Sequence, residues 1–310
     1  MTFPFATADS SAGSRRRRRK IWVGLALIPA VPMAASWWFT EPLVDHPVSP
    51  PPRQIDTTVA IEPVAEVERE WPEVPLTGDE AKRFLLEEGL RAARRIEQVV
   101  DYTATFRKQE RIAGKLGPEQ TMAMKVRNNP FAIYLKFLAP KAGKEVVYAE
   151  GHHDNKVIAH NGDWTRRLIP RLAVEPDSAV ALADTRHPVT EAGLVNLSRK
   201  LLQYRKMDIG DPDAETIVDR TTGPDGRPRL RSTHIHHRAD GSRPFAKVVV
   251  LYDPETRIPI QISSYDWPAS GGSGELELAE RYTYDDLRLD ATLTYSDFDP
   301  KNPDYAFMRF

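Results

Sequence analysis

The sequence of 310 residues contains no cysteine. This absence excludes disulfide bonds, thiolate zinc sites, iron–sulfur clusters and a cysteine nucleophile. It also excludes a lipidated N-terminal cysteine, so the chain is not itself a bacterial lipoprotein. The sequence further lacks a phosphate-binding loop, a nucleophile elbow and an H-E-x-x-H zinc motif. It therefore predicts a protein without a cofactor, and a binding protein rather than an enzyme.

The chain also lacks an excess of charge. Lys plus Arg number 43 and Asp plus Glu number 44, and residues 76–310 carry 35 of each. A domain that binds nucleic acid needs a basic surface, because phosphate neutralisation supplies most of its affinity. We therefore expect no nucleic-acid partner.

Only one long uncharged run is present, at residues 21–39, and it follows a basic N-terminus, residues 1–20. Its length and its terminal Trp37, Trp38 and Phe39 favour a membrane anchor. A cleaved signal peptide, cut after Ala34-Ala35-Ser36, is the alternative. Residues 40–76 follow as an acidic linker, with eight prolines between residues 41 and 75. Both alternatives place residues 77–310 in the periplasm, either anchored to the inner membrane by residues 21–39 or released.

The hydrophobic pattern of residues 77–310 changes from a helical period to a period of two. Thr77 and Glu80 match a capping box, and apolar residues recur at helical spacing to about residue 100. A second helical region is expected at about 176–207. Alternating segments separated by hairpin-sized turns predict antiparallel strands at about 102–107, 122–126, 131–137, 145–149, 156–160, 216–221, 230–238, 246–252, 260–265 and 275–288. The predicted class is α+β, with a curved antiparallel half-barrel covered by a few helices.

Several predicted strands have one strongly apolar face. Because the helices are few, incomplete filling of the half-barrel would leave an apolar cavity, whereas complete filling would make the same residues an ordinary core. The candidate lining of that cavity is aromatic, aliphatic and methionine-rich: Phe106, Met122, Met124, Phe131, Ile133, Leu135, Phe137 and Trp164.

Six segments of the domain resemble a bacterial family known as domain of unknown function 1571: residues 101–110, 134–140, 145–148, 186–191, 282–287 and 297–300. The first third of the domain, from its opening helix to the strand that ends at Pro140, also resembles the superfamily of lipoprotein carriers that includes LolA, LolB and the sensor RseB. This second resemblance implies a half-barrel that binds acyl chains in an apolar cavity. It transfers no functional residue, since no shared motif fixes one.

Three functions are therefore open. The first is a membrane-tethered binding protein that holds a lipid or an acylated polypeptide. The second is a sensor module, similar to RseB, that binds another exported protein. The third is a metal-dependent hydrolase that uses His234 and His236, which lie two apart on a strand and so share one face. The sequence names no third ligand for such a metal.

Overall fold

The computed structural model describes residues 70–162, 171–223, 225–239, 241, 243–268 and 275–308. The predicted anchor at residues 21–39, most of the predicted linker and Trp164 lie outside these residues. Within the described ranges, no helix is both long enough and apolar enough to cross a membrane.

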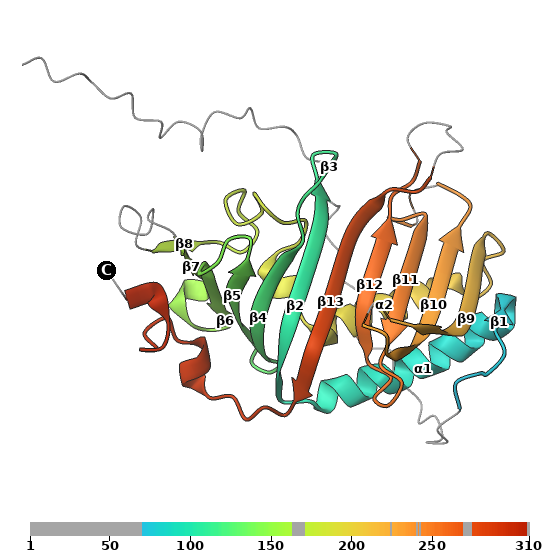
Figure 1. The fold of residues 1–310 in the computed structure, drawn as a ribbon, viewed down its shortest axis with the longest axis horizontal. Helices are drawn as coiled ribbons and strands as arrows, with labels where there is room; N and C mark the ends of the chain where they lie inside the picture. Colours follow the sequence, from blue (N-terminus) through green and yellow to red (C-terminus); the bar gives the residue numbers. More distant parts are fainter. Residues whose placement is uncertain are drawn as a thin grey trace, which may run out of the picture. The chain divides into compact units, whose positions relative to one another are not determined.

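The described chain forms one curved, open antiparallel sheet of 13 strands (Figure 1). Its spatial order is β1-β9-β10-β11-β12-β13-β2-β4-β5-β6-β7-β8, and β3 pairs with β2. The strands are β1 (Leu76–Thr77), β2 (Asp101–Ile112), β3 (Lys115–Leu116), β4 (Gln120–Arg127), β5 (Ala132–Ala139), β6 (Glu145–Ala149), β7 (Val157–His160), β8 (Leu172–Val174), β9 (Ala214–Thr222), β10 (Pro228–His236), β11 (Lys247–Tyr252), β12 (Pro259–Tyr265) and β13 (Leu278–Leu289). The predicted α+β class and the predicted antiparallel strands are confirmed.

Two α-helices, α1 (Gly78–Gln98) and α2 (Leu194–Asp208), pack on the same face of this sheet (Figure 1). We call it the helix face and the opposite one the outer face. The predicted capping box is wrong: Thr77 occupies the N-cap position, but its side chain makes no capping hydrogen bond. Thr77 instead pairs with Ile217 as the last residue of β1, so its backbone is held by the sheet.

The predicted helical region at 176–207 is also corrected. Its helix begins only at Leu194, and residues 175–193 are turns with one short 3-10 helix, Val189–Glu191. Pro176 and Pro188 supply no backbone N–H, and Gly193 has a φ of +99°, so this stretch does not continue α2 toward its N-terminus.

Side chains on both faces of the sheet are buried. On the helix face, Trp71, Phe84 and Leu85 pack with Val218 and Leu230 at one end of the sheet. On the outer face, the C-terminal segment, residues 290–308, covers β5–β7, where Phe298, Tyr305 and Phe307 pack against residues such as Tyr134 and Ile158. The Tyr134 and Tyr305 rings stack with their centroids 4.0 Å apart. The C-terminal segment thus occupies the outer face of β5–β7 and leaves their helix face to other elements.

Candidate functional site

The residues predicted to line a cavity lie together on the helix face of β2, β4 and β5. Phe106 pairs across the strands with Met122, and Met122 with Phe137. Met124 pairs with Leu135 in the next row. Direct cross-strand partners share a face, so these rows form a continuous apolar surface. We call Phe106, Met122, Met124, Phe131, Ile133, Leu135 and Phe137 the apolar floor.

The apolar floor belongs to the main hydrophobic cluster of the structure. Phe106, Met122, Met124, Ile133 and Phe137 are at most 7% exposed, and Phe131 and Leu135 are half-buried. Leu194 at the start of α2 and Val189 before it pack against this cluster. The apolar floor is therefore closed in this structure.

Part of the cover of the apolar floor is irregular. It is the segment of residues 175–193, which we call the strap; Leu194, Val195 and Leu197 of α2 form another part of the cover. Val189 and Ala192 of the strap pack on the main cluster. Yet every strap residue from Glu175 to Ala192 is half-buried or exposed, and only Gly193 is buried. A segment that buries so little apolar surface gains little hydrophobic free energy from its position, and few buried apolar contacts are typical of a region that opens locally.

Charged and polar contacts fasten the strap to the sheet. Glu280 on β13 accepts from His187 Nε2 at 3.0 Å and pairs with Arg186 Nε at 3.2 Å. Glu110 on β2 accepts from the Arg186 backbone N–H at 3.2 Å and from the Tyr282 hydroxyl at 2.5 Å. We call Glu110, Glu280, Arg186 and His187 the clasp.

The clasp carries charge at neutral pH. Burial alone would lower the pKa of His187, but its contacts with Glu191 and Glu280 raise that pKa to about 9. Burial alone would raise the pKa of Glu280, but its hydrogen bond with His187 and the charges of His187 and Arg186 hold it below the ordinary value. His187 is therefore protonated and Glu280 ionised, so the strap is fastened by a charged pair.

The strap ends at a glycine that the geometry requires. Gly193 has a φ of +99°, and a Cβ there would lie 3.0 Å from the Tyr102 hydroxyl. That hydroxyl accepts from the Leu194 backbone N–H at 2.9 Å. Side chains at this position would be both strained and crowded. The end of the strap is thus seated directly on Tyr102, next to Val126 and Phe131.

Sequence reasoning did not identify the clasp. A signal was present, because strand alternation places Lys108 and Glu110 on the face of Phe106, and Glu280 on the face of Tyr282 and Tyr284. Charged residues that continue an apolar face are candidates for buried pairs. Their partners could not be inferred, since pairing of β13 with β2 brings together residues 170 positions apart in the sequence.

The outer face holds an open groove of about 340 Å³ over β9–β13. Its lining includes Arg231, Val249, Ser263, Tyr265 and Arg281. Val249, Ser263 and Arg281 pair in one row across the strands, on the face opposite to the apolar floor. None of the predicted cavity residues in the described part of the chain lines this groove.

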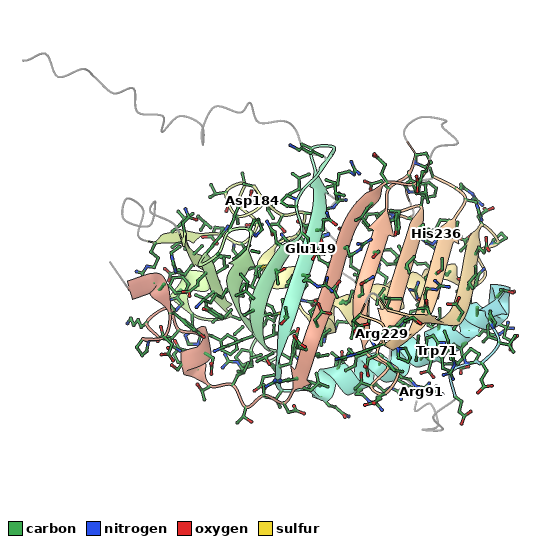
Figure 2. The ribbon with its side chains drawn as sticks, viewed as in Figure 1. Trp71, Arg91, Glu119, Asp184, Arg229 and His236 are labelled. Carbon is green, nitrogen blue, oxygen red and sulfur yellow. The ribbon has the colours of Figure 1, made fainter. Side chains whose placement is uncertain are left out.

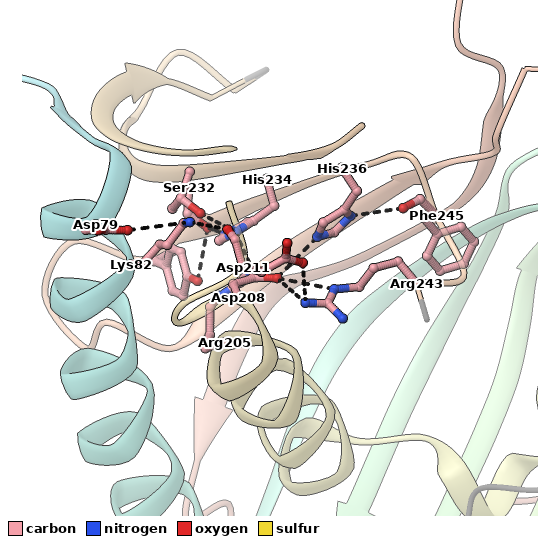
Figure 3. A network of polar contacts seen from close by, with 12 residues as sticks. Asp79, Lys82, Arg205, Asp208, Asp211, Ser232, His234, His236, Arg243 and Phe245 are labelled. Carbon is pink, nitrogen blue, oxygen red and sulfur yellow. Dashed lines mark hydrogen bonds and ion pairs between the residues drawn. The ribbon is translucent and has the colours of Figure 1, made fainter. Parts of the chain in front are cut away.

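The two histidines of the hydrolase hypothesis meet a single carboxylate (Figure 3). Asp208, the last residue of α2, lies 3.3 Å from His234 Nδ1 through Oδ2, and 3.2 Å from His236 Nε2 through Oδ1. Arg243 donates to the same Oδ1 through Nη2 at 3.0 Å. Burial alone would raise the pKa of Asp208, but its contacts with the histidines and the Arg205 charge lower it. Burial lowers the pKa of His234 to about 3, so this ring is neutral at neutral pH.

This network has the composition of a structural tie rather than of a metal site. Asp208 Oδ1 already accepts a hydrogen bond from Arg243, and His236 Nδ1 lies 3.0 Å from the Phe245 carbonyl oxygen. His234 Nε2 lies 3.1 Å from the Ser232 hydroxyl. Over the described ranges, no three histidine, aspartate or glutamate side chains are placed to hold a metal ion. The network fastens the end of α2 to β10.

The middle of the strap and the network of polar contacts around Asp208 lie over different parts of the sheet. Figure 2 shows Asp184 of the strap over the half that contains β4–β8, and His236 over the half that contains β9–β12. The strap approaches the Asp208 network at Phe245, where the Arg186 guanidinium lies 5.9 Å from the centroid of the ring.

A family model for proteins of unknown function, DUF1571, matches residues 99–307 of the sequence. The chain belongs to the DUF1571 family. The matched range spans β2 to the C-terminal segment, and so includes the apolar floor, the strap, the clasp and the Asp208 network. The resemblance seen in the sequence is confirmed.

Among solved structures, the chain is similar to the Mycobacterium tuberculosis lipoprotein LppX, with 12% identity, a TM-score of 0.40, and coverage of 70% of this chain and 99% of that one. It is similar to a LolA superfamily protein from Nitrosomonas europaea, with 10% identity, a TM-score of 0.28, and coverage of 70% and 97%. MucB is similar at 13% identity and a TM-score of 0.36, with coverage of 70% and 62%. No curated protein matches the sequence.

Proposed function

We propose that this DUF1571 protein is a non-catalytic binding protein that takes up the acyl chain of a lipid or of an acylated polypeptide between the strap and the apolar floor. One observation carries the proposal: an aligned apolar surface on three strands is covered in part by a segment that has no fully buried residue between Glu175 and Ala192. An acyl chain that replaced the strap would keep the apolar floor away from water.

The energetics favour an apolar ligand. Burial of each methylene group of an acyl chain contributes about 0.8 kcal/mol, so a chain that fits the apolar floor needs few polar contacts. The strap loses mainly polar contacts when it moves aside, and water replaces part of their free energy. We propose that the chain acts in the periplasm, close to the inner membrane to which residues 21–39 anchor it.

Photolabelling of the full chain in membranes tests the proposal. The probe is a photoactivatable analogue of palmitic acid, and labelled peptides are identified by mass spectrometry. We expect adducts on the strap and on β2, β4 and β5, and we expect unlabelled palmitate to compete for them.

A pair of matched variants locates the site. Leu135→Gln places an amide on the apolar floor and should lower the labelling of the strap. Leu251→Gln places the same group in the groove on the outer face, and should leave that labelling unchanged. Labelling of the outer face alone, or labelling that palmitate does not compete, would contradict the proposal and would favour the sensor hypothesis.

A further inference from the structure

Three lysines surround a single aspartate at the middle of the strap. Lys141 Nζ lies 2.5 Å from Asp184 Oδ2, and Lys144 Nζ lies 4.0 Å from the same oxygen. Lys108 donates to the Asp184 backbone carbonyl at 3.3 Å. Lys108 belongs to β2, Lys141 and Lys144 to the turn between β5 and β6, and Asp184 to the strap. We call the three lysines the lysine cluster.

The lysine cluster carries more positive charge than its surroundings neutralise. Lys108 also pairs with Glu110 at 3.0 Å, so the three ammonium groups face two carboxylates, Asp184 and Glu110. In the part of the chain that the structure describes, Asp184 is the one carboxylate within ion-pair distance of Lys141 and Lys144.

The titration of these groups reflects the same imbalance. Burial lowers the pKa of Lys144, and the positive charges of Lys141 and Lys108 lower it further. Burial alone would raise the pKa of Asp184, but the hydrogen bond from Lys141 and the charges of the lysine cluster lower it. Both shifts have the direction expected where one negative group faces several positive ones.

The lysine cluster adjoins the end of the apolar floor. Lys144 Nζ lies 5.1 Å from the centroid of the Phe137 ring. Leu138, the next residue on β5, is 48% exposed. An amphiphile whose chain lay along the apolar floor as far as Phe137 would bring its polar end to these lysines.

We infer that the lysine cluster binds the anionic head group, a carboxylate or a phosphate, of the acyl ligand, and that Asp184 holds this place while the strap is closed. This inference rests on the proposed function. The ligand anion exchanges with Asp184, so that the middle of the strap is released as the chain enters. Ammonium groups suit both anions, and charge-assisted hydrogen bonds are stronger than neutral ones.

Competition against the photoactivatable fatty acid tests this on the full chain. Palmitate and hexadecanol, which share one acyl length and differ in charge, are the competitors. We expect the double variant Lys141→Gln/Lys144→Gln to weaken competition by palmitate about tenfold or more, since it removes charged hydrogen bonds to the anion. Competition by hexadecanol should change little. The double variant Lys136→Gln/Lys156→Gln is the control, because these lysines are of similar exposure and each pairs with one glutamate elsewhere.

Asp184→Asn gives a result of opposite sign. It removes the carboxylate that competes with the ligand, so palmitate should compete better, and by a larger factor than hexadecanol. A role of Asp184 in folding alone would weaken both competitors or neither.

The remaining outcomes separate the hypotheses. Equal weakening of palmitate and hexadecanol by the Lys141→Gln/Lys144→Gln variant, or no weakening of either, would overturn the head-group inference while acyl binding stands. Failure of both compounds to compete on the unaltered chain would overturn the proposed function itself. Inorganic phosphate distinguishes the source of the anion: if it displaces the probe as well as palmitate does, the lysine cluster binds a free anion and the head-group inference is wrong.

Discussion

The clasp sets how often the strap opens, and loss of the charge on His187 should make opening measurably more frequent. The pKa of His187 rises from 6.5 to about 9 on folding, and its side chain is 24% exposed. A shift of this size corresponds at pH 7 to roughly 2–3 kcal/mol in favour of the closed strap. His187→Gln keeps hydrogen-bonding atoms and removes the charge. It should therefore raise the opening equilibrium constant about 30- to 150-fold.

The absence of cysteine makes this opening easy to measure. Val126 on β4 is fully buried, and its Cγ1 lies 3.8 Å from the position of a Cβ on Gly193 at the end of the strap. A Val126→Cys variant carries one thiol, which a labelling reagent reaches when the strap opens. Val147 on β6 is equally buried but belongs to the cluster on the outer face, beneath the C-terminal segment. Val147→Cys is therefore the matched reporter.

We expect His187→Gln to accelerate labelling of the Val126→Cys thiol about 30- to 150-fold. The rate of labelling of the Val147→Cys thiol should change little. His237→Gln makes the same substitution at a histidine that is 59% exposed and lies outside the clasp, so it should change neither rate. Equal acceleration at both thiols would mean that the whole domain, not the strap, is loosened. No acceleration at either would refute the reasoning that the charge on His187 holds the strap closed.

Three further predictions follow from the same contacts. The ratio of the labelling rate at Val126→Cys to that at Val147→Cys should rise with pH between about 6.5 and 9. The raised pKa of His187 stabilises the closed strap fully below pH 6.5, and this stabilisation is lost as the pH passes about 9, the pKa in the folded state. A ratio that does not change with pH would contradict the role of the clasp. Asp208→Ala leaves the arginine and histidine partners of the network buried without their carboxylate. It should lower the free energy of unfolding, measured by denaturant titration, by about 3–5 kcal/mol. A loss below about 1 kcal/mol would show that Asp208 does not hold α2 to the sheet. Gly193→Ala should destabilise the domain by about 1–3 kcal/mol, since the position combines a positive φ with a close approach to the Tyr102 hydroxyl. Gly210→Ala, at a position with a positive φ in open space, should lower the free energy of unfolding by less in the same titration.

Local pattern was sufficient to predict the apolar floor. The alternation of Met122, Met124 and Val126, and of Ile133, Leu135 and Phe137, assigns each side chain to a face from the sequence alone, because a strand repeats every two residues. The antiparallel class followed equally directly from the short turns between such segments. That these residues line a cavity remains a prediction, and for Trp164 the structure does not describe the site.

Long-range pairing decided what the pattern could not. His234 and His236 share a face, as their spacing predicted, but the partner that gives them a role is Asp208, on a different element. In the same way Glu280 reaches His187 only because β13 lies next to β2 in the sheet and the strap crosses that junction. Such contacts depend on the order of strands, which no local period encodes.

The sequence by itself therefore determined the ten longer strands, the apolar face of those that alternate, and that the helices are few; it did not predict the short strands β1, β3 and β8. Only the tertiary structure decided that residues 175–193 form an irregular cover, and that charge rather than apolar burial fastens it. The physical reason is the range of the interactions. Periodicity is fixed by backbone geometry over a few residues, whereas a buried ion pair joins groups that approach each other only after the chain has folded.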